Sequence, residues 1–379
     1  MNTYLSADQQ ATREQYKTYA REHLASCAEQ ISQGKGALKE FLQKLGQQGY
    51  LGLTVPKEYG GQSLPFLNAV WLAEAIGHYQ PAIAVVLAEH ITVIELIKKF
   101  GTDTQKSRYL PLLARGESLA ATAFNEPTAG TDFKSAKTEA KRENNQINLS
   151  GTKTVVVNAP DLGLAVVSAI DSEGGKLALL LVEMSEEPAS VKISAGQKLL
   201  GMDAIAIHDV VFTSRKLTAD AELKGPAEGA AELIMYAGDI AKTIVAAAAT
   251  GMTEQCLSTA VIHANAREQF GQKIAQFQGI QWKIADMSMD NAAAQMLVYR
   301  AAWSKEEAPS DFRNQAAMCK WYAAKTARLH SGEAIQILGV SGLLANSPIE
   351  QFYRDAKVME LCEGTSEYQK VIIADELGV

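Results

Sequence analysis

The sequence predicts an α+β protein, mainly α-helical, in which a β-rich middle part separates two helical parts. In the first and last thirds of the chain, apolar residues recur at steps of three and four. Between them, short β-branched and aliphatic runs are separated by Gly, Asn and Ser. The order α, then β, then α differs from the alternation of a doubly wound fold. We therefore predict three domains, at residues 1–118, 119–225 and 226–379.

The first domain is predicted to be a bundle of helices. Val93, Ile94 and Ile97 follow a helical period, as do apolar residues around position 41. Two segments rich in turn residues interrupt the helical pattern. One is the loop VPKEYGG at 55–61, and the other is Gly-Thr-Asp at 101–103, which is typical of a boundary between two helices.

The middle domain is predicted to be a small antiparallel sheet. Its strands are expected in four runs, at 152–157, 164–170, 177–182 and 206–212. In the third domain the helical period returns, for example at Ile280, Ile284 and Met287 and again near residues 297–301. This pattern indicates a second helical bundle.

Composition limits the classes of partner. The chain has 379 residues, 47% of them apolar, and a formal net charge of −7 without a dense Lys or Arg run, so we expect neither nucleic acid nor a membrane as partner. The start of the chain lacks the apolar core of a signal peptide. No run is expected to span a membrane, and even the Ala-rich stretch at 244–250 is too short.

Cysteine and histidine usage adds two further expectations. The four cysteines lie far apart and show no CxxC spacing, so neither a zinc site nor a disulfide framework is predicted, and a cytoplasmic location fits best. The six histidines never recur at the spacing of a helical metal site, so we assign no metal.

Common nucleotide and hydrolase motifs are missing from the sequence. There is no GxGxxG, no GxxxxGK[ST] and no GxSxG, and the glycines at 339 and 342 have the wrong spacing for any of them. A Rossmann-type nicotinamide site is therefore not expected, and nothing favours a hydrolase.

The strongest candidate for chemistry is Glu363 in the segment YRDAKVMELCEGTSEYQ at 353–369. A carboxylate desolvated beside Leu361 and Cys362 has a raised pKa and can act as a general base near neutral pH. The alternative is that this segment is only a turn before the last helix, with Ser366 as N-cap and Gln369 completing a capping box.

Five segments, in order along nearly the whole chain, favour the catalytic interpretation. They are LGLTVPKEYGG at 51–61, the stretch from GTDTQKSRYL to EPTAGTD at 101–132, LSGTK at 149–153, AREQFGQKIAQFQGIQWKIADM at 266–287, and the segment at 353–369. Together they resemble the acyl-CoA dehydrogenase flavoprotein family. The resemblance implies an N-terminal helical domain, a middle antiparallel β domain and a C-terminal four-helix bundle, assembled as a homo-oligomer, a tetramer or a dimer.

The resemblance also implies a reaction. Family members bind FAD and an acyl thioester, remove an α-proton with a Glu, and pass the β-hydrogen as hydride to the flavin. Glu363 corresponds to that base, and its backbone N–H, with a flavin ribityl hydroxyl, polarises the thioester carbonyl. Some relatives carry the base on an earlier helix, at the position of Ala241, which cannot serve here. Electron-transferring flavoprotein is the expected electron acceptor.

Cofactor contacts carry over by position. Asn125 stands where the family usually has Thr, and Val155 to Val157 stand where it has Trp-Ile-Thr, although three valines also make an ordinary buried strand. Another group matches positions that reach the FAD of a neighbouring subunit, with Arg267 suited to its pyrophosphate. The implied FAD-binding residues are Phe124, Asn125, Thr131, Val155, Val157, Arg267, Phe270, Phe277, Gln278, Gln336, Gly339, Thr365 and Glu367.

The implied substrate-binding residues are Thr131, Asp239, Lys242 and Gly364. The family usually has Asp-x-x-Arg at 239–242, and lysine keeps the charge but lacks the planar fork that binds phosphate bidentately. Two alternatives to a plain acyl-CoA dehydrogenase therefore stay open. One is a dehydrogenase of acyl or aminoacyl groups on a carrier protein in polyketide or nonribosomal peptide pathways. The other is a non-catalytic member that acts as an assembly partner, against which the retained Glu363 argues.

Overall fold

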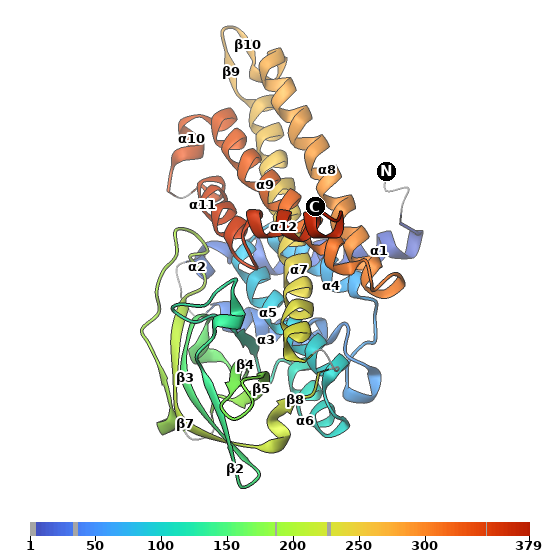
Figure 1. Cartoon of the computed structure of the whole chain (residues 1–379). Helices are drawn as coiled ribbons and strands as arrows, with labels where there is room; N and C mark the ends of the chain where they lie inside the picture. The colour runs from blue at the N-terminus through green and yellow to red at the C-terminus, as the bar shows by residue number, and fades with distance from the viewer. Residues whose placement is uncertain (1–4, 33–36, 186–187, 226–228, 346) are drawn as a thin grey trace.

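The computed structural model describes residues 5–32, 37–185, 188–225, 229–345 and 347–379. Figure 1 shows a bundle of long helices at the top, a β domain at the lower left, and shorter helices at the centre and right. The three-part α, β, α architecture predicted from the sequence is confirmed.

The first part of the chain is helical throughout. Thr102 begins α6 with a capping box, because its side chain accepts from the N–H of Gln105 while the Gln105 side chain accepts from the N–H of Thr102. The predicted helix boundary at 101–103 is therefore confirmed. Pro81 starts α5, where its missing N–H has no intrahelical partner to lose. The helices are α1 (Ala7–Leu24), α2 (Ala28–Ser32), α3 (Ala37–Gln47), α4 (Phe66–Gly77), α5 (Pro81–Phe100) and α6 (Asp103–Ala114).

The middle part forms one eight-stranded sheet with the order β6-β7-β3-β2-β4-β5-β8, to which β1 adds beside β4. Most neighbouring pairs are antiparallel, as predicted, but β1 and β2 each run parallel to β4, so the sheet is mixed. Each predicted run lies largely within one strand. The strands are β1 (Ala120–Ala123), β2 (Glu139–Glu143), β3 (Gln146–Val157), β4 (Leu164–Asp171), β5 (Leu177–Glu183), β6 (Val191–Ile193), β7 (Ile207–Thr218) and β8 (Glu222–Leu223).

The last part is a bundle around three long helices, α7 (Ala230–Ala266), α8 (Gln278–Glu307) and α9 (Phe312–Leu338). A short hairpin joins α7 to α8 at the far tip of the bundle (Figure 1). The predicted start of this domain, at 226, falls on residues 226–228, which lie outside the described residues. The other elements are β9 (Glu268–Gln269), β10 (Gln272–Lys273), α10 (Val340–Leu343), α11 (Pro348–Leu361) and α12 (Ser366–Glu376).

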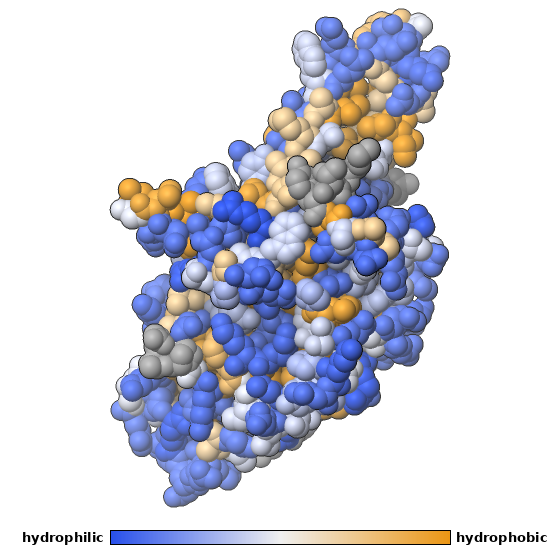
Figure 2. All heavy atoms as spheres, turned by 90° about the vertical axis from the view of Figure 1, so that its right-hand side faces the viewer, coloured by the Kyte–Doolittle hydropathy of each residue, from blue (hydrophilic) through white to orange (hydrophobic). Residues whose placement is uncertain are grey.

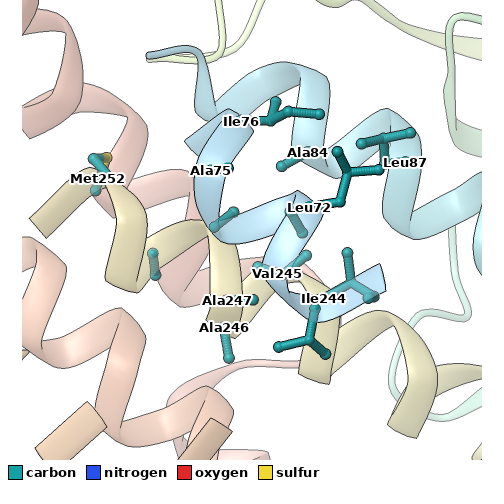
Figure 3. Close-up of a cluster of buried hydrophobic side chains, with 14 of the residues drawn as sticks. Leu72, Ala75, Ile76, Ala84, Leu87, Ile244, Val245, Ala246, Ala247 and Met252 are labelled. Carbon is teal, nitrogen blue, oxygen red and sulfur yellow. The ribbon is translucent and has the colours of Figure 1, made fainter. Parts of the chain in front are cut away.

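Helices α4, α5 and α7 pack together at the centre of the molecule. Figure 3 shows side chains of α4, α5 and α7, among them Leu72, Leu87 and Ile244, meeting in one buried cluster. Two glycines permit this approach: a Cβ on Gly251 would lie 1.9 Å from the carbonyl oxygen of Glu74, and one on Gly77 would lie 2.4 Å from that of Ala248. These contacts join α4 to α7, and residues of α5 and α7 both line one cavity.

Helix α7 corrects one expectation. By length and hydropathy it could cross a membrane, whereas no such run was predicted. However, 83% of its most apolar 18-residue window is buried inside the protein. Its apolar composition is therefore explained by its place in the core.

Candidate active site

A cavity of about 440 Å³ lies where the three parts of the chain meet. Its walls come from α5, from β1 and the loop after it, from β3, from α7, and from the connection between α11 and α12. Ten of the sequence-predicted site residues line it, although they are far apart in the chain: Phe124, Asn125, Thr131, Val155, Val157, Asp239, Lys242, Glu363, Gly364 and Thr365.

Glu363 occupies the short turn between α11 and α12. Its φ of 55° lies in the left-handed region, which costs a residue with a Cβ about 1 kcal/mol. Thr365, not Ser366, caps α12, because the Thr365 side chain accepts from the N–H of Tyr368 at 3.3 Å. The N-cap predicted at Ser366 is therefore wrong by one residue, and Gln369 has a different task from a capping box.

Two side chains hold this turn by its carbonyl oxygens. Lys320 Nζ, fully buried on α9, donates to the carbonyl oxygens of Glu360 and Gly364, each at 3.0 Å. Gln369 Nε2 donates to the carbonyl oxygens of Gly364 at 2.9 Å and Glu363 at 3.2 Å. Sequence reasoning missed Lys320. The available signal was its position on an otherwise apolar face, four residues after Ala316 and three before Ala323.

The surroundings of Glu363 make its carboxyl group a weak acid. Burial disfavours the ionised form, and the negative charge of Glu89 disfavours it further, while Lys320 and Lys242 partly offset both effects. The result raises the pKa of Glu363 to about 8. Among the described residues, no group donates a hydrogen bond to this carboxylate or pairs with it. Such a group can accept a proton near neutral pH.

A buried ion pair fixes the loop after β1. Lys153 Nζ lies 2.7 Å from Glu126 Oε1, with both side chains almost fully buried. Glu126 also accepts from the backbone N–H groups of Lys137 at 2.6 Å and Thr138 at 3.0 Å. Burial opposes ionisation of Glu126, but these hydrogen bonds prevail and lower its pKa to about 2. The charged pair therefore anchors the loop that presents Phe124, Asn125 and Thr131.

The three valines on β3 do not form a regular strand. The pairing of β3 with β7 shifts between Lys153 and Val156, and Val155 between them has a φ of 58°, an outlier for a β-branched residue. Val155 is 45% exposed and lines the cavity, whereas Val156 and Val157 are buried. The reading of Val155 as an ordinary buried strand residue is therefore wrong, and the bulge directs it to the site.

The predicted substrate pair is formed within α7. Lys242 Nζ donates to Asp239 Oδ1 at 2.8 Å, and both side chains are buried in the cavity wall. Arg313 of α9 lines the same cavity and was not predicted from the sequence. Its Nη1 lies 2.7 Å from Met235 Sδ. The cavity therefore does contain a guanidinium, but on a different helix from the one that the Asp-x-x-Arg pattern would use.

Seven predicted cofactor residues do not line this cavity. Four of them lie at or beside the hairpin that Figure 1 places at the tip of the bundle, opposite the β domain: Arg267, Phe270, Phe277 and Gln278. Phe270 is 94% exposed and meets Phe277 edge to face, with ring centroids 6.3 Å apart. The remaining three lie on the surface of the C-terminal part: Gln336, Gly339 and Glu367. One chain alone therefore does not bring these residues to the cavity.

The α, β, α arrangement, with a carboxyl-bearing cavity where its parts meet, matches the class of flavin-dependent oxidoreductases that the sequence resembles. Sequence profiles support this class: those of the acyl-CoA dehydrogenase N-terminal, middle and C-terminal domains match residues 6–117, 121–214 and 231–378. The chain belongs to the acyl-CoA dehydrogenase family, whose members oxidise or reduce CH–CH bonds.

Full-length relatives agree with this assignment. Acryloyl-CoA reductase (NADH) of Anaerotignum propionicum is 33% identical over 100% of this chain and 96% of the relative. Butyryl-CoA dehydrogenase of Megasphaera elsdenii has a TM-score of 0.92 and 28% identity over 100% of both chains. The prolyl acyl carrier protein oxidase AnaB has a TM-score of 0.91 and 29% identity over 99% of this chain and 100% of its own.

The family is FAD-dependent, and the cavity fits a flavin. The bulge turns the exposed Val155 towards the cavity, and the side chains of Asn125 and Thr131, exposed on the same cavity, hydrogen-bond to no described residue. These polar groups and the apolar surfaces of Val155 and Val157 are suited to a flavin ring, which is flat and has polar edges.

Proposed function

We propose that the protein is an FAD-dependent acyl-thioester dehydrogenase in which Glu363 is the general base. The observation that carries the proposal is the Glu363 carboxylate itself. It lines the cavity, no described residue neutralises it by pairing, and its pKa is raised to about 8. A glutamate on an ordinary surface turn would have neither the burial nor the fixed backbone.

The mechanism follows from this placement. The thioester binds with its α-carbon within reach of the Glu363 carboxylate, which removes the α-proton as the electrons of that C–H bond form the new double bond. FAD, when bound, supplies the two-electron acceptor that takes the β-hydrogen as hydride. The products are an enoyl thioester, a protonated Glu363 and a reduced cofactor.

The backbone N–H of Glu363 supports a second role for this residue. Among the described residues, the N–H of Glu363 donates no hydrogen bond to the protein. It is therefore available to the thioester carbonyl oxygen, where negative charge develops as the proton leaves. The left-handed φ of Glu363 and the bonds from Lys320 and Gln369 to its neighbours keep this N–H in place before substrate binds.

Two candidate functions differ in the group that carries the acyl thioester. The first is acyl-CoA, supported by the family and by Asp239, Lys242 and Arg313 on the cavity. The second is an acyl or aminoacyl group on a carrier protein, and one observation favours it: the buried Lys242 ammonium is already paired with Asp239. Such a cation contributes less to the extra phosphates of CoA than a free guanidinium fork would. The likeness to the prolyl acyl carrier protein oxidase AnaB is consistent with this alternative.

A homo-oligomer, a dimer or a tetramer, is part of the proposal. Large apolar side chains are exposed on the C-terminal bundle at Ile262, Trp282, Met289, Val340 and Leu343. Figure 2 shows hydrophobic residues gathered along the arm at the top of the molecule. Exposed apolar side chains gathered on one part of a protein favour contact between subunits. In such an assembly, Arg267 and its neighbours would contact the FAD of another subunit, which explains why they lie far from their own cavity.

The decisive experiment follows flavin colour and product mass together. Purified protein is mixed anaerobically with the same acyl group on CoA and on a carrier protein, and enoyl product is detected by mass spectrometry. Bleaching of the flavin with loss of two hydrogens from the acyl group supports the proposal. A colourless protein without flavin would support the non-catalytic alternative. Electron-transferring flavoprotein, the acceptor that we propose, is then tested as the reoxidant.

A further inference from the structure

A second carboxylate faces the cavity from α5. Val85, Glu89 and Thr92 are spaced by four and three residues, so they lie in one row on the helix, and all three line the cavity. Glu89 is only 8% exposed. Together with Val157 and Ile205, it also lines a second cavity of about 550 Å³, so it lies where the two spaces meet.

One of the two oxygens of the Glu89 carboxylate accepts hydrogen bonds from the protein. Its Oε2 accepts from the backbone N–H of Thr122 at 2.8 Å and from the Thr122 hydroxyl at 2.7 Å. Within the described ranges, nothing donates to its Oε1 and no cation pairs with it. The buried Glu95, two turns along the same helix, is different, since Lys98 and Lys305 lie 2.8 Å and 2.9 Å from its oxygens.

The cations of the site have contacts elsewhere, and Arg313 Nη1 lies 2.7 Å from Met235 Sδ. Lys242 donates to Asp239, and Lys320 donates to the carbonyl oxygens around Glu363. The adjacent His90 is directed to the carbonyl oxygen of Leu113 and the N–H of Ala120. Among the described residues, four carboxylates line the cavity, and two of them, Glu126 and Asp239, are paired with lysines. The other two are Glu89 and Glu363, which are close enough for the charge of Glu89 to raise the pKa of Glu363.

An apolar acyl chain would suit this arrangement poorly. Packing methylene groups against Glu89 would remove water from Oε1 without replacing its hydrogen bond, at a cost of about 1–3 kcal/mol. A protonated amine would instead donate to Oε1 and reduce the repulsion between the two carboxylates. A buried charge is stable when it is paired and hydrogen-bonded, and here the ligand would provide both.

We propose that Glu89 selects the substrate by binding an amino group on the acyl part, so that the enzyme acts on aminoacyl thioesters. This inference rests on the proposed thioester-dehydrogenase function and adds the substrate class to it. Thr122 orients the carboxylate by donating hydrogen bonds to Oε2, and Oε1 is then available to accept a hydrogen bond from the ligand. Glu363 keeps its task as base, and Glu89 takes no proton from the substrate.

The test separates recognition from turnover. Holoenzyme is titrated with unreactive phosphopantetheine thioethers that carry either a pentyl group or 4-aminobutyl, 3-aminobutyl and 2-aminobutyl groups, and binding is read from the flavin absorption spectrum. We expect the best amino analogue to bind at least ~10-fold more tightly than the pentyl one, the equivalent of one charge-assisted hydrogen bond. Glu89→Gln should bring the two within ~2-fold, and Glu89→Leu should favour the pentyl analogue.

Thr92→Val is the matched control, because it alters the same row of α5 without touching a carboxylate and should retain the preference for the amine. If the wild type binds the pentyl analogue as tightly as every amino analogue, or if Glu89→Gln keeps the amine preference, the role of Glu89 is wrong while the proposed function stands. If no thioether of either kind perturbs the flavin, the proposed function itself is contradicted. If Glu89→Gln loses its flavin, the comparison of the pentyl and amino analogues in the wild type alone tests the role of Glu89.

Discussion

Lys320 Nζ lies 3.0 Å from the carbonyl oxygen of Gly364, the residue that follows the base Glu363. The same ammonium donates to the carbonyl oxygen of Glu360 on the other side of the base. A buried lysine is costly unless its N–H groups find acceptors, and burial does lower the pKa of Lys320. The cation and the turn therefore stabilise each other, which places Glu363 against the cavity.

Lys320→Met tests this relationship. The change keeps most of the side-chain volume but removes one donor from each of two carbonyl oxygens, and among the described residues the oxygen of Gly364 then has only Gln369 as a side-chain donor. We therefore expect a lower melting temperature and flavin reduction by substrate slowed at least ~10-fold. Lys325→Met, at an exposed site on the same helix, is the control and should change neither. A folded Lys320→Met protein with FAD bound and normal reduction rates would show that the turn holds its shape without the lysine.

The pH dependence of flavin reduction should report Glu363. The base must be ionised to accept the α-proton, and its pKa is raised to about 8 by burial and by Glu89. The single-turnover rate at limiting substrate should therefore rise with pH and level off above an apparent pKa of about 8. Removing the charge by Glu89→Gln should move this midpoint to lower pH. A rate that is constant from pH 6 to pH 9 would contradict the assignment.

Much of this site could be predicted from the sequence because its parts lie in short, ordered motifs. Glu363 with its Gly and Thr, and the loop from Phe124 to Thr131, are local patterns, and the first of them and both ends of the loop line the cavity. The domain order followed from periodicity, since strands and helices space their apolar residues differently. The parallel pairing of β1 with β4 could not be foreseen, because pairing depends on the whole sheet.

The residues that sequence reasoning missed act through tertiary contacts. The sequence places Lys320 on an otherwise apolar helix face, but only packing shows that it reaches two carbonyl oxygens. Glu89 lies in an apolar helix with other buried polar residues, so its free oxygen depends on which neighbours approach. The positive φ of Val155 contradicts the usual preference of valine and becomes visible only with the register of β3 and β7.

Arg267→Ala tests whether FAD is shared between subunits. The residue is exposed at the tip of the bundle and far from its own cavity, so a contact with FAD requires a neighbour. We expect lower FAD occupancy after purification and a looser assembly, measured by absorption and by light scattering. The exposed Lys273, on the same hairpin, gives the control Lys273→Ala. A monomeric protein with full FAD content would contradict this prediction.

The thioester carrier is tested by kcat/KM for one acyl group on CoA and on a carrier protein. Because Lys242 is paired with Asp239, we expect simple acyl-CoAs to saturate the enzyme poorly. A carrier protein would add surface contacts, whose contribution should fall as salt is raised from low to moderate concentration. CoA thioesters turned over as well as every carrier-bound form would eliminate the carrier alternative and leave acyl-CoA as the substrate.

The most direct test of the central claim is anaerobic flavin reduction by a thioester substrate in Glu363→Gln. The amide keeps the shape of the side chain and cannot accept the α-proton, so FAD should stay bound while bleaching slows by ~100-fold or more. Glu376→Gln, at the exposed end of α12, should bleach at the wild-type rate. If Glu363→Gln reduces its flavin as fast as the wild type with the same thioester, Glu363 is not the base and the proposed mechanism is wrong.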